Sequence, residues 1–289
     1  MTRALPGRVR CRALPGWYLP YVFELAPIRK GLGAEVVGFD FGHAPSAETI
    51  RALREALLAQ GLLLFRGRTL EPGLQITFTR VLGGGVHACS APTRVIPQFP
   101  EIFRVSNQRE QGNLNNGLYW HSDGAYLEVP TAVTLHHIVR PTPDGDTLYA
   151  DLAGAYERLQ ARDRALFATM RTISQVPTVA HPLVRRHPAT GRNILYVNLE
   201  PSAKIVDDSG KEHPRLVAFL REHLNRGCYR HKWRPGDLVV VDNFAAAHCA
   251  TPAHPNALRV LHRTTVPGQR VWWQRAESPS ATPLPETMD

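Results

Sequence analysis

The hydrophobic pattern near the amino terminus predicts a helix, a buried strand and a second helix in succession. Ser46 suits a helix N-cap and Gly61 suits the C-terminal cap, and between them apolar residues recur at helical spacing, at Ile50, Leu53, Leu57 and Leu58. The apolar run 62–65 follows at once and predicts a buried strand. Residues 72–81 predict a second helix that ends at the glycine run 83–85.

From residue 102 onward the pattern becomes that of short strands rich in β-branched and aromatic residues. Two helices, at about 155–171 and 213–226, interrupt them. Many short strands with a few flanking helices favour a mostly β fold, a double-stranded β-helix (jelly-roll, cupin-like) barrel, over a doubly wound α/β sheet. The predicted strands are 102–105, 132–139, 147–150, 194–197, 238–241 and 258–266.

The chain divides into an N-terminal arm and one domain. Residues 1–25 are rich in arginine and interrupted by proline, which predicts an arm, and residues 26–289 form the single predicted domain. Two long polar stretches, near 106–118 and 199–213, are predicted to be lid loops over a pocket.

Composition narrows the class of protein. The net charge of +9 is spread along the chain and mixed with acids, so it favours a small anionic substrate or a generally basic surface over nucleic acid. No apolar run is long enough to cross a membrane. The four cysteines show no C-x-x-C spacing, which predicts a reducing, cytoplasmic location. The sequence does not determine the oligomeric state and is compatible with a homo-oligomer.

Candidate metal ligands lie at His121 and Asp123. In an extended strand, residues two apart point to the same face, so the imidazole and the carboxylate converge. His248 follows an apolar strand and sits among alanines that leave room for a metal. Two histidines and one carboxylate form the set that non-haem Fe(II) oxygenases use, although the same set also binds zinc.

A second feature is the predicted strand 258–266. Arg259, Leu261 and Arg263 share one of its faces. If that face looks into the barrel, the two guanidinium groups need anions beside them, and arginine suits bidentate carboxylate recognition. The alternative is a strand with a solvated basic face.

Over residues 26–268 the sequence resembles the taurine dioxygenase-like family of Fe(II)/2-oxoglutarate-dependent dioxygenases, which includes the 2,4-dichlorophenoxyacetate dioxygenases. The motifs that carry the resemblance are W-H-S-D at 120–123, G-D-T-L-Y at 145–149, A-Y-E at 155–157, H-P-A-T-G-R at 187–192, L-Y-V-N at 195–198, G-D-L-V-V-V-D-N at 236–243, His248, and R-V-L-H-R-T-T at 259–265.

The resemblance implies a role for each matched residue. His121, Asp123 and His248 would hold Fe(II), and Arg259 and Thr147 would bind the distal carboxylate of 2-oxoglutarate, with O2 as the second cosubstrate. Arg263 would meet an anionic group of the substrate, and Gly117 and Tyr119 are also assigned to the substrate side. His87 is assigned there from its position after the glycine run rather than from a matched motif, and a structural histidine is the alternative. Gly117 stands where taurine dioxygenases keep a substrate-binding asparagine, which argues against taurine itself.

The predicted reaction is oxidation, most simply hydroxylation, of an unactivated C–H bond in a small anionic compound, with release of succinate and CO2. Desaturation and oxidative cleavage on the same scaffold stay open. Asp123 argues against halogenation, because related halogenases carry a small residue in place of the carboxylate. A zinc hydrolase and a non-catalytic basic binding protein are the remaining alternatives.

Overall fold

The computed structural model describes residues 23–89, 95–108, 110, 117–175 and 178–268, together with the backbone of residues 9–10. Most of the expected N-terminal arm therefore lies outside the described residues. Within it, β1 (Val9–Arg10) pairs with β2, and β2 itself begins at Glu24. Most of the expected lid loop 106–118 also lies outside them.

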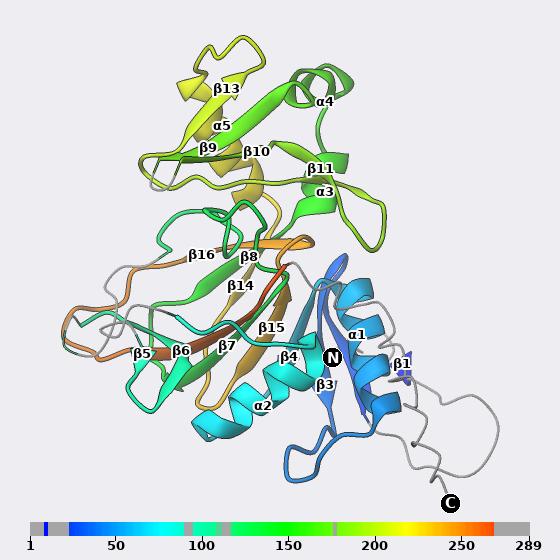
Figure 1. Ribbon diagram of the computed structural model, residues 1–289, viewed down its shortest axis with the longest axis vertical. Coiled ribbons are helices and arrows are strands. Elements are labelled where there is room, and N and C mark those ends of the chain that lie inside the picture. The colour runs from blue at the N-terminus through cyan, green and yellow to red at the C-terminus, as the bar shows by residue number, and fades with distance from the viewer. Residues whose placement is uncertain are drawn as a thin grey trace, which may run out of the picture.

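A nine-stranded sheet forms the larger wall of the molecule (Figure 1). Its neighbours are antiparallel except β3 and β4, which run parallel. In spatial order after β1, its strands are β2 (Glu24–Arg29), β3 (Leu32–Val37), β4 (Leu62–Phe65), β15 (Leu238–Asp242), β7 (Val133–Arg140), β17 (Val260–Val266), β6 (Phe99–Ser106) and β5 (Val95–Ile96).

A three-stranded sheet closes the other side of the barrel. It consists of β14 (Cys228–His231), β8 (Thr147–Asp151) and β16 (Ala246–Ala250), in that spatial order. Side chains from both sheets meet in one buried cluster that includes Leu261 of the large sheet and Tyr149 of the small one. Two sheets around a shared core make a jelly roll, so the predicted fold class is confirmed.

β4 and residues 238–241 of β15 are apolar because both faces of these central strands are buried. Leu62 and Leu64 face the cluster between the sheets, whereas Leu63 and Phe65 join a second cluster on the outer face. There α1 (Ala47–Gln60) and α2 (Pro72–Gly83) cover the sheet (Figure 1). The outer layer is therefore helical.

Helix α1 begins and ends as its sequence predicts. The Ser46 side chain accepts a hydrogen bond from the Thr49 backbone N–H at 3.1 Å, and Gly61 caps the carboxyl end. The predicted strand 62–65 and the second predicted helix also form, as β4 and α2.

The predicted helix at 155–171 is wrong. The segment contains two short helices, α3 (Leu152–Glu157) and α4 (Ala161–Phe167), followed by β9 (Met170–Gln175). Gln160 has an extended backbone and starts the second helix. From Met170, buried and less buried residues alternate, which is a strand pattern rather than a helical one.

The expected loop 199–213 is not structureless, because it contains β13 (Lys204–Asp207), which pairs with β9. Its role as a lid stays a prediction. β9 also pairs with β10 (Thr178–Pro182), and β11 (Val184–Arg186) pairs with β12 (Asn193–Leu195). These strands and α5 (Pro214–Asn225) form the upper part of the molecule in Figure 1. Among the described helices, none is long and apolar enough to span a membrane.

Candidate metal centre

The two candidate histidine ligands are joined through their backbones. The His121 N–H donates to the His248 carbonyl at 3.0 Å, and the His248 N–H donates back at 2.8 Å. His248 lies on β16, whereas His121 is an isolated bridge residue and Asp123 begins a turn. The expected regular strand around His121 is therefore absent, but the two imidazoles still meet, with ring centroids 4.3 Å apart.

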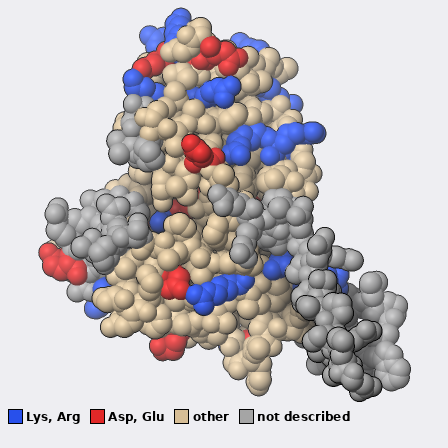
Figure 2. Space-filling model, in the orientation of Figure 1, with Lys and Arg blue, Asp and Glu red and all other residues tan. Residues whose placement is uncertain are grey.

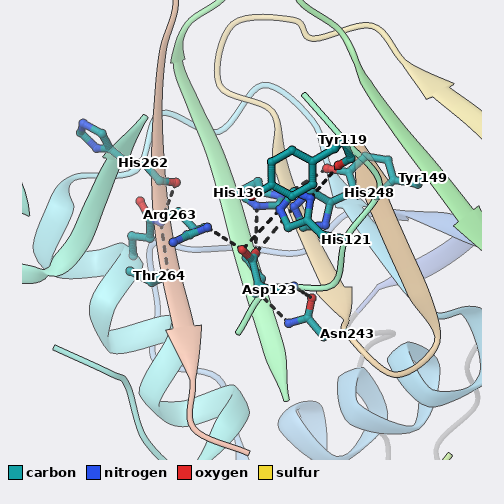
Figure 3. A network of polar contacts seen from close by, with 12 residues as sticks. Tyr119, His121, Asp123, His136, Tyr149, Asn243, His248, His262, Arg263 and Thr264 are labelled. Atoms are coloured by element: carbon teal, nitrogen blue, oxygen red, sulfur yellow. Dashed lines mark hydrogen bonds and ion pairs between the residues drawn. The ribbon is translucent and has the colours of Figure 1, made fainter. Parts of the chain in front are cut away.

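Asp123 completes the cluster. One ligand atom from each of His121, Asp123 and His248 lies within 4.8 Å of the others (Figure 3). Asp123 Oδ1 is 3.9 Å from His121 Nε2, and Oδ2 is 3.7 Å from His248 Nε2. The Oδ2 atom is buried and has no hydrogen-bond partner among the described residues. A divalent cation between the carboxylate and the imidazoles would satisfy it, so these residues fit an Fe(II) site.

Local hydrogen bonds set the tautomer of His121. Its Nδ1 lies 2.8 Å from the Tyr119 carbonyl oxygen, which can only accept, so Nδ1 carries the proton. The Nε2 lone pair is then free for a metal, which is the usual arrangement of a ligating histidine.

The charges also suit a cation. Burial lowers the pKa of His121 and, together with His121, lowers that of His248 well below its usual value, so both rings are neutral. Burial acts to raise the pKa of Asp123, but its polar neighbours, with the Arg263 guanidinium the largest influence, outweigh burial and hold that pKa well below its usual value. Two neutral imidazoles and one carboxylate are the protonation states that metal binding needs.

Two further residues at the centre were not found from the sequence as functional. His136 on β7 places Nε2 at 3.6 Å from Asp123 Oδ2, and its Nδ1 is 3.2 Å from the Tyr149 hydroxyl (Figure 3). Asn243 accepts a hydrogen bond from the Asp123 backbone N–H at 3.2 Å. Asn243 lies in the quoted 236–243 motif, which was a usable signal, whereas nothing in the sequence marks His136.

Arg263 points into the same centre. Its Nη1 donates to Asp123 Oδ1 at 2.5 Å, and its guanidinium lies over the Phe103 ring at 4.4 Å. Figure 3 shows Arg263 directed toward Asp123 and His262 on the opposite side of the strand. The face of β17 that carries Arg263 therefore looks into the barrel, and the alternative of a solvated basic face is wrong.

Arg259 and Thr147 meet around one indole ring. Arg259 is 7% exposed, donates from Nε to the Gly145 carbonyl at 2.9 Å and lies 5.9 Å from the ring centroid of Trp233. The Trp233 Nε1 donates to Thr147 Oγ1 at 3.0 Å. Burial lowers the pKa of Arg259, which shows how far its charge is removed from water.

A cavity of about 750 Å³ opens beside the metal centre. Asp123, Arg263 and His87 line it together with apolar residues such as Phe103 and Tyr126. The structure thus brings His87 to the same space as Arg263.

Known proteins with related sequences identify the family. Residues 24–265 match the model of the taurine catabolism dioxygenase TauD, TfdA family. The chain belongs to this family.

Three similar proteins of this dioxygenase family illustrate the relationship. An alpha-ketoglutarate-dependent sulfate ester dioxygenase of Pseudomonas putida is 28% identical, over 86% of this chain and 92% of the relative. An alpha-ketoglutarate-dependent 2,4-dichlorophenoxyacetate dioxygenase of Burkholderia sp. (strain RASC) is 30% identical, over 78% and 88%. A crystallised taurine dioxygenase from Burkholderia xenovorans superposes with a TM-score of 0.74 at 29% identity, over 86% and 90%.

As a member of this dioxygenase family, the protein is an enzyme that uses Fe(II), 2-oxoglutarate and O2. Family membership therefore excludes the two alternatives that the sequence left, a zinc hydrolase and a non-catalytic basic binding protein.

Two residues expected on the substrate side of this dioxygenase instead contact His121. A Cβ atom on Gly117 would lie 2.7 Å from His121 Cε1. The ring centroid of Tyr119 is 5.0 Å from that of His121. Neither is among the residues that line the described cavity, so their predicted contact with substrate stays a prediction.

Proposed function

We propose that this dioxygenase hydroxylates a C–H bond of a small organic anion bound in the cavity beside Asp123. The overall reaction would be R–H + O2 + 2-oxoglutarate giving R–OH + succinate + CO2. One oxygen atom enters the product and the other enters succinate, so the atoms balance without another reductant.

The observation that carries this proposal is the position of Arg263. The residue lines the cavity and also contacts Asp123, so an anion held by its guanidinium lies next to the metal centre. Arginine is well suited to bind carboxylate, sulfonate or sulfate groups through paired hydrogen bonds. The relatives named above act on a sulfate ester and on 2,4-dichlorophenoxyacetate, which both carry a negative charge.

The proposed roles of the other residues follow from their surroundings. His121, Asp123 and His248 would hold Fe(II), which supplies the oxidising chemistry when bound. Arg259 and Thr147 would bind the distal carboxylate of 2-oxoglutarate, because a buried guanidinium needs a counter-anion. His87, on the cavity wall, would contact the substrate.

The charge distribution supports a small-molecule substrate rather than nucleic acid. On the face drawn in Figure 2, basic and acidic side chains are interspersed and form no continuous basic stripe. We further propose a cytoplasmic location, which the three free cysteines among the described residues support, at Cys89, Cys228 and Cys249.

A paired substrate panel tests the proposal. Carboxylates, sulfonates and sulfate esters would each be assayed beside a neutral analogue of the same size, with succinate release measured under Fe(II), 2-oxoglutarate and O2. We expect only the anions to raise the rate above the background without substrate. Equal stimulation by the neutral analogues would mean that Arg263 does not select an anionic substrate. Product analysis by mass spectrometry then separates a gain of one oxygen from a loss of two hydrogens.

Substitution of Arg263 provides the second test. Arg263→Ala should raise KM for the anionic substrate by about 10- to 100-fold, because it removes a charge-assisted contact. Its Mn(II) affinity is measured in parallel, since Arg263 also contacts Asp123. Arg162→Ala, at an exposed position, is the matched control and should leave KM unchanged.

A further inference from the structure

Trp233 connects the two residues assigned to 2-oxoglutarate with a buried polar cluster behind them. The indole is 7% exposed and belongs to the core between the two sheets. Its Nε1 donates to Thr147 Oγ1, and its ring lies beside the Arg259 guanidinium. One side chain therefore contacts both.

The hydrogen bond to Thr147 has a directional consequence. A threonine hydroxyl has one proton to donate and two lone pairs, whereas an indole N–H can only donate. Trp233 therefore occupies a lone pair of Thr147 Oγ1 and leaves the hydroxyl proton for another acceptor. Within the described part of the chain, Thr147 donates that proton to no residue.

Arg259 also has hydrogen-bond donors without a partner among the described residues. Its Nε is bound to the Gly145 carbonyl, and no hydrogen bond joins its two terminal nitrogens to another described residue. Arg259 and Thr147 thus both hold unused donors next to Trp233. A carboxylate has two oxygens with several lone pairs, so it can accept from both.

Trp233 is itself held in a fixed orientation. The His231 ring packs edge-on against it, with centroids 4.4 Å apart. His231 Nδ1 is 3.0 Å from the Tyr229 hydroxyl, and its Nε2 is 3.2 Å from Asp237 Oδ2. The same Asp237 oxygen accepts a hydrogen bond from Arg66 Nη1 at 2.7 Å. These contacts limit the rotation of the indole.

We propose that Trp233 is a positioning residue for 2-oxoglutarate: by donating to Thr147 Oγ1, it directs the Thr147 hydroxyl proton toward the distal carboxylate that Arg259 binds. This inference rests on the proposed function, which assigns Thr147 and Arg259 to that carboxylate.

Binding measurements on the Mn(II)-loaded protein test the inference without turnover. Calorimetry gives the Kd of 2-oxoglutarate for wild type, Trp233→Phe, Thr147→Val and the double variant. Trp233→Phe should weaken binding by about fivefold, the effect of losing one oriented hydrogen bond. In the Thr147→Val variant, Trp233→Phe should not weaken 2-oxoglutarate binding further, because Trp233 acts through the Thr147 hydroxyl.

A second ligand serves as an internal control. 2-Oxovalerate has the same chain length but lacks the distal carboxylate, so Trp233→Phe should leave its Kd unchanged. Loss of packing alone would weaken both ligands. If Trp233→Phe does not fold, replacement of Trp233 by benzothienylalanine keeps the ring size and removes only the N–H. Thermal unfolding of the metal-free variants checks that the fold is retained.

Different results would contradict the proposed cosubstrate site and the positioning role of Trp233. If Thr147→Val and Arg259→Ala both bind 2-oxoglutarate as wild type does, the proposed cosubstrate site is wrong. If both weaken binding but Trp233→Phe does not, the positioning role is overturned and the site stands. The positioning role is also overturned if Trp233→Phe weakens 2-oxoglutarate binding equally in wild type and in the Thr147→Val variant.

Discussion

At the scale of single residues, Gly117 lies closer to the metal centre than its expected role in substrate binding implies. Its φ of +77° lies in the left-handed region that favours glycine. In addition, a Cβ atom would fall 2.7 Å from His121 Cε1. A side chain here would push the imidazole that we assign to the metal, so the glycine protects the geometry of a ligand.

Gly117→Ala should therefore weaken metal binding. We expect a loss in Mn(II) affinity of about 10- to 100-fold, the usual effect of disturbing the surroundings of a metal ligand. Gly191→Ala is the matched control, because Gly191 also has a positive φ but has open space where its Cβ would stand. Gly191→Ala should bind Mn(II) as wild type does, and equal metal affinities in the two variants would show that the contact with His121 does not control metal binding.

The residues of the centre differ in how far the sequence could reveal them. His121, Asp123 and His248 belong to a recognisable ligand set, and Arg263 follows from strand alternation. His136 gives no such signal, because the sequence of a strand does not show which residues of other segments will pack against one of its histidines. The approach of His136 to Asp123 depends on where the tertiary structure places residues 121–123 relative to β7.

At the scale of elements, the strands with continuous apolar or β-branched runs were predicted, and those defined by pairing were not. β16 has the sequence Ala-Ala-His-Cys-Ala, which has little strand preference, and it is extended because it pairs with β8. The predicted helix at 155–171 was wrong because the segment contains a break between two short helices and a change to a strand at Met170.

Strand β17 also carries a pH-sensitive group on its outer face. Burial, together with His137 and Arg104, lowers the pKa of His262 from 6.5 to about 4. The unfolded chain therefore binds a proton at His262 between pH 6.5 and 4, whereas the folded protein does not, so falling pH favours unfolding over this window.

His262→Gln should reduce the acid sensitivity of the fold. The free energy of unfolding of wild type should fall more steeply between pH 6.5 and 4, with this histidine contributing up to about 1.4 kcal/mol per pH unit. Urea unfolding at several pH values measures both slopes. Parallel slopes for the two proteins would mean that His262 accepts its proton equally well when folded.

At the scale of the whole molecule, the candidate metal centre lies where separate parts of the barrel meet. His248 comes from the three-stranded sheet, whereas His121 and Asp123 belong to the segment that leads into β7 of the nine-stranded sheet. Asn243, which follows β15, holds the Asp123 backbone. The jelly roll itself could be predicted from the many short strands, but this meeting point depends on long-range pairing that periodicity does not encode.

Metal removal should accordingly lower the stability of the whole domain. A metal that binds only the folded state stabilises it by RT ln(1 + [M]/Kd), so each tenfold rise in free Mn(II) above Kd adds about 1.4 kcal/mol to the free energy of unfolding. Chelation by EDTA should reverse this gain. The metal-free fold should persist, because Arg263 still neutralises Asp123 and burial keeps His121 and His248 uncharged.

Asp123→Ala distinguishes binding at this centre from binding elsewhere. The variant lacks the carboxylate ligand, so its unfolding free energy should not depend on Mn(II) or on EDTA over the same range. If Mn(II) stabilises the variant as much as wild type, the cation binds at another place and the three residues are not its ligands. If wild type alone responds, the metal links the two sheets through His121, Asp123 and His248, and the stability of the barrel is coupled to the occupancy of its catalytic centre.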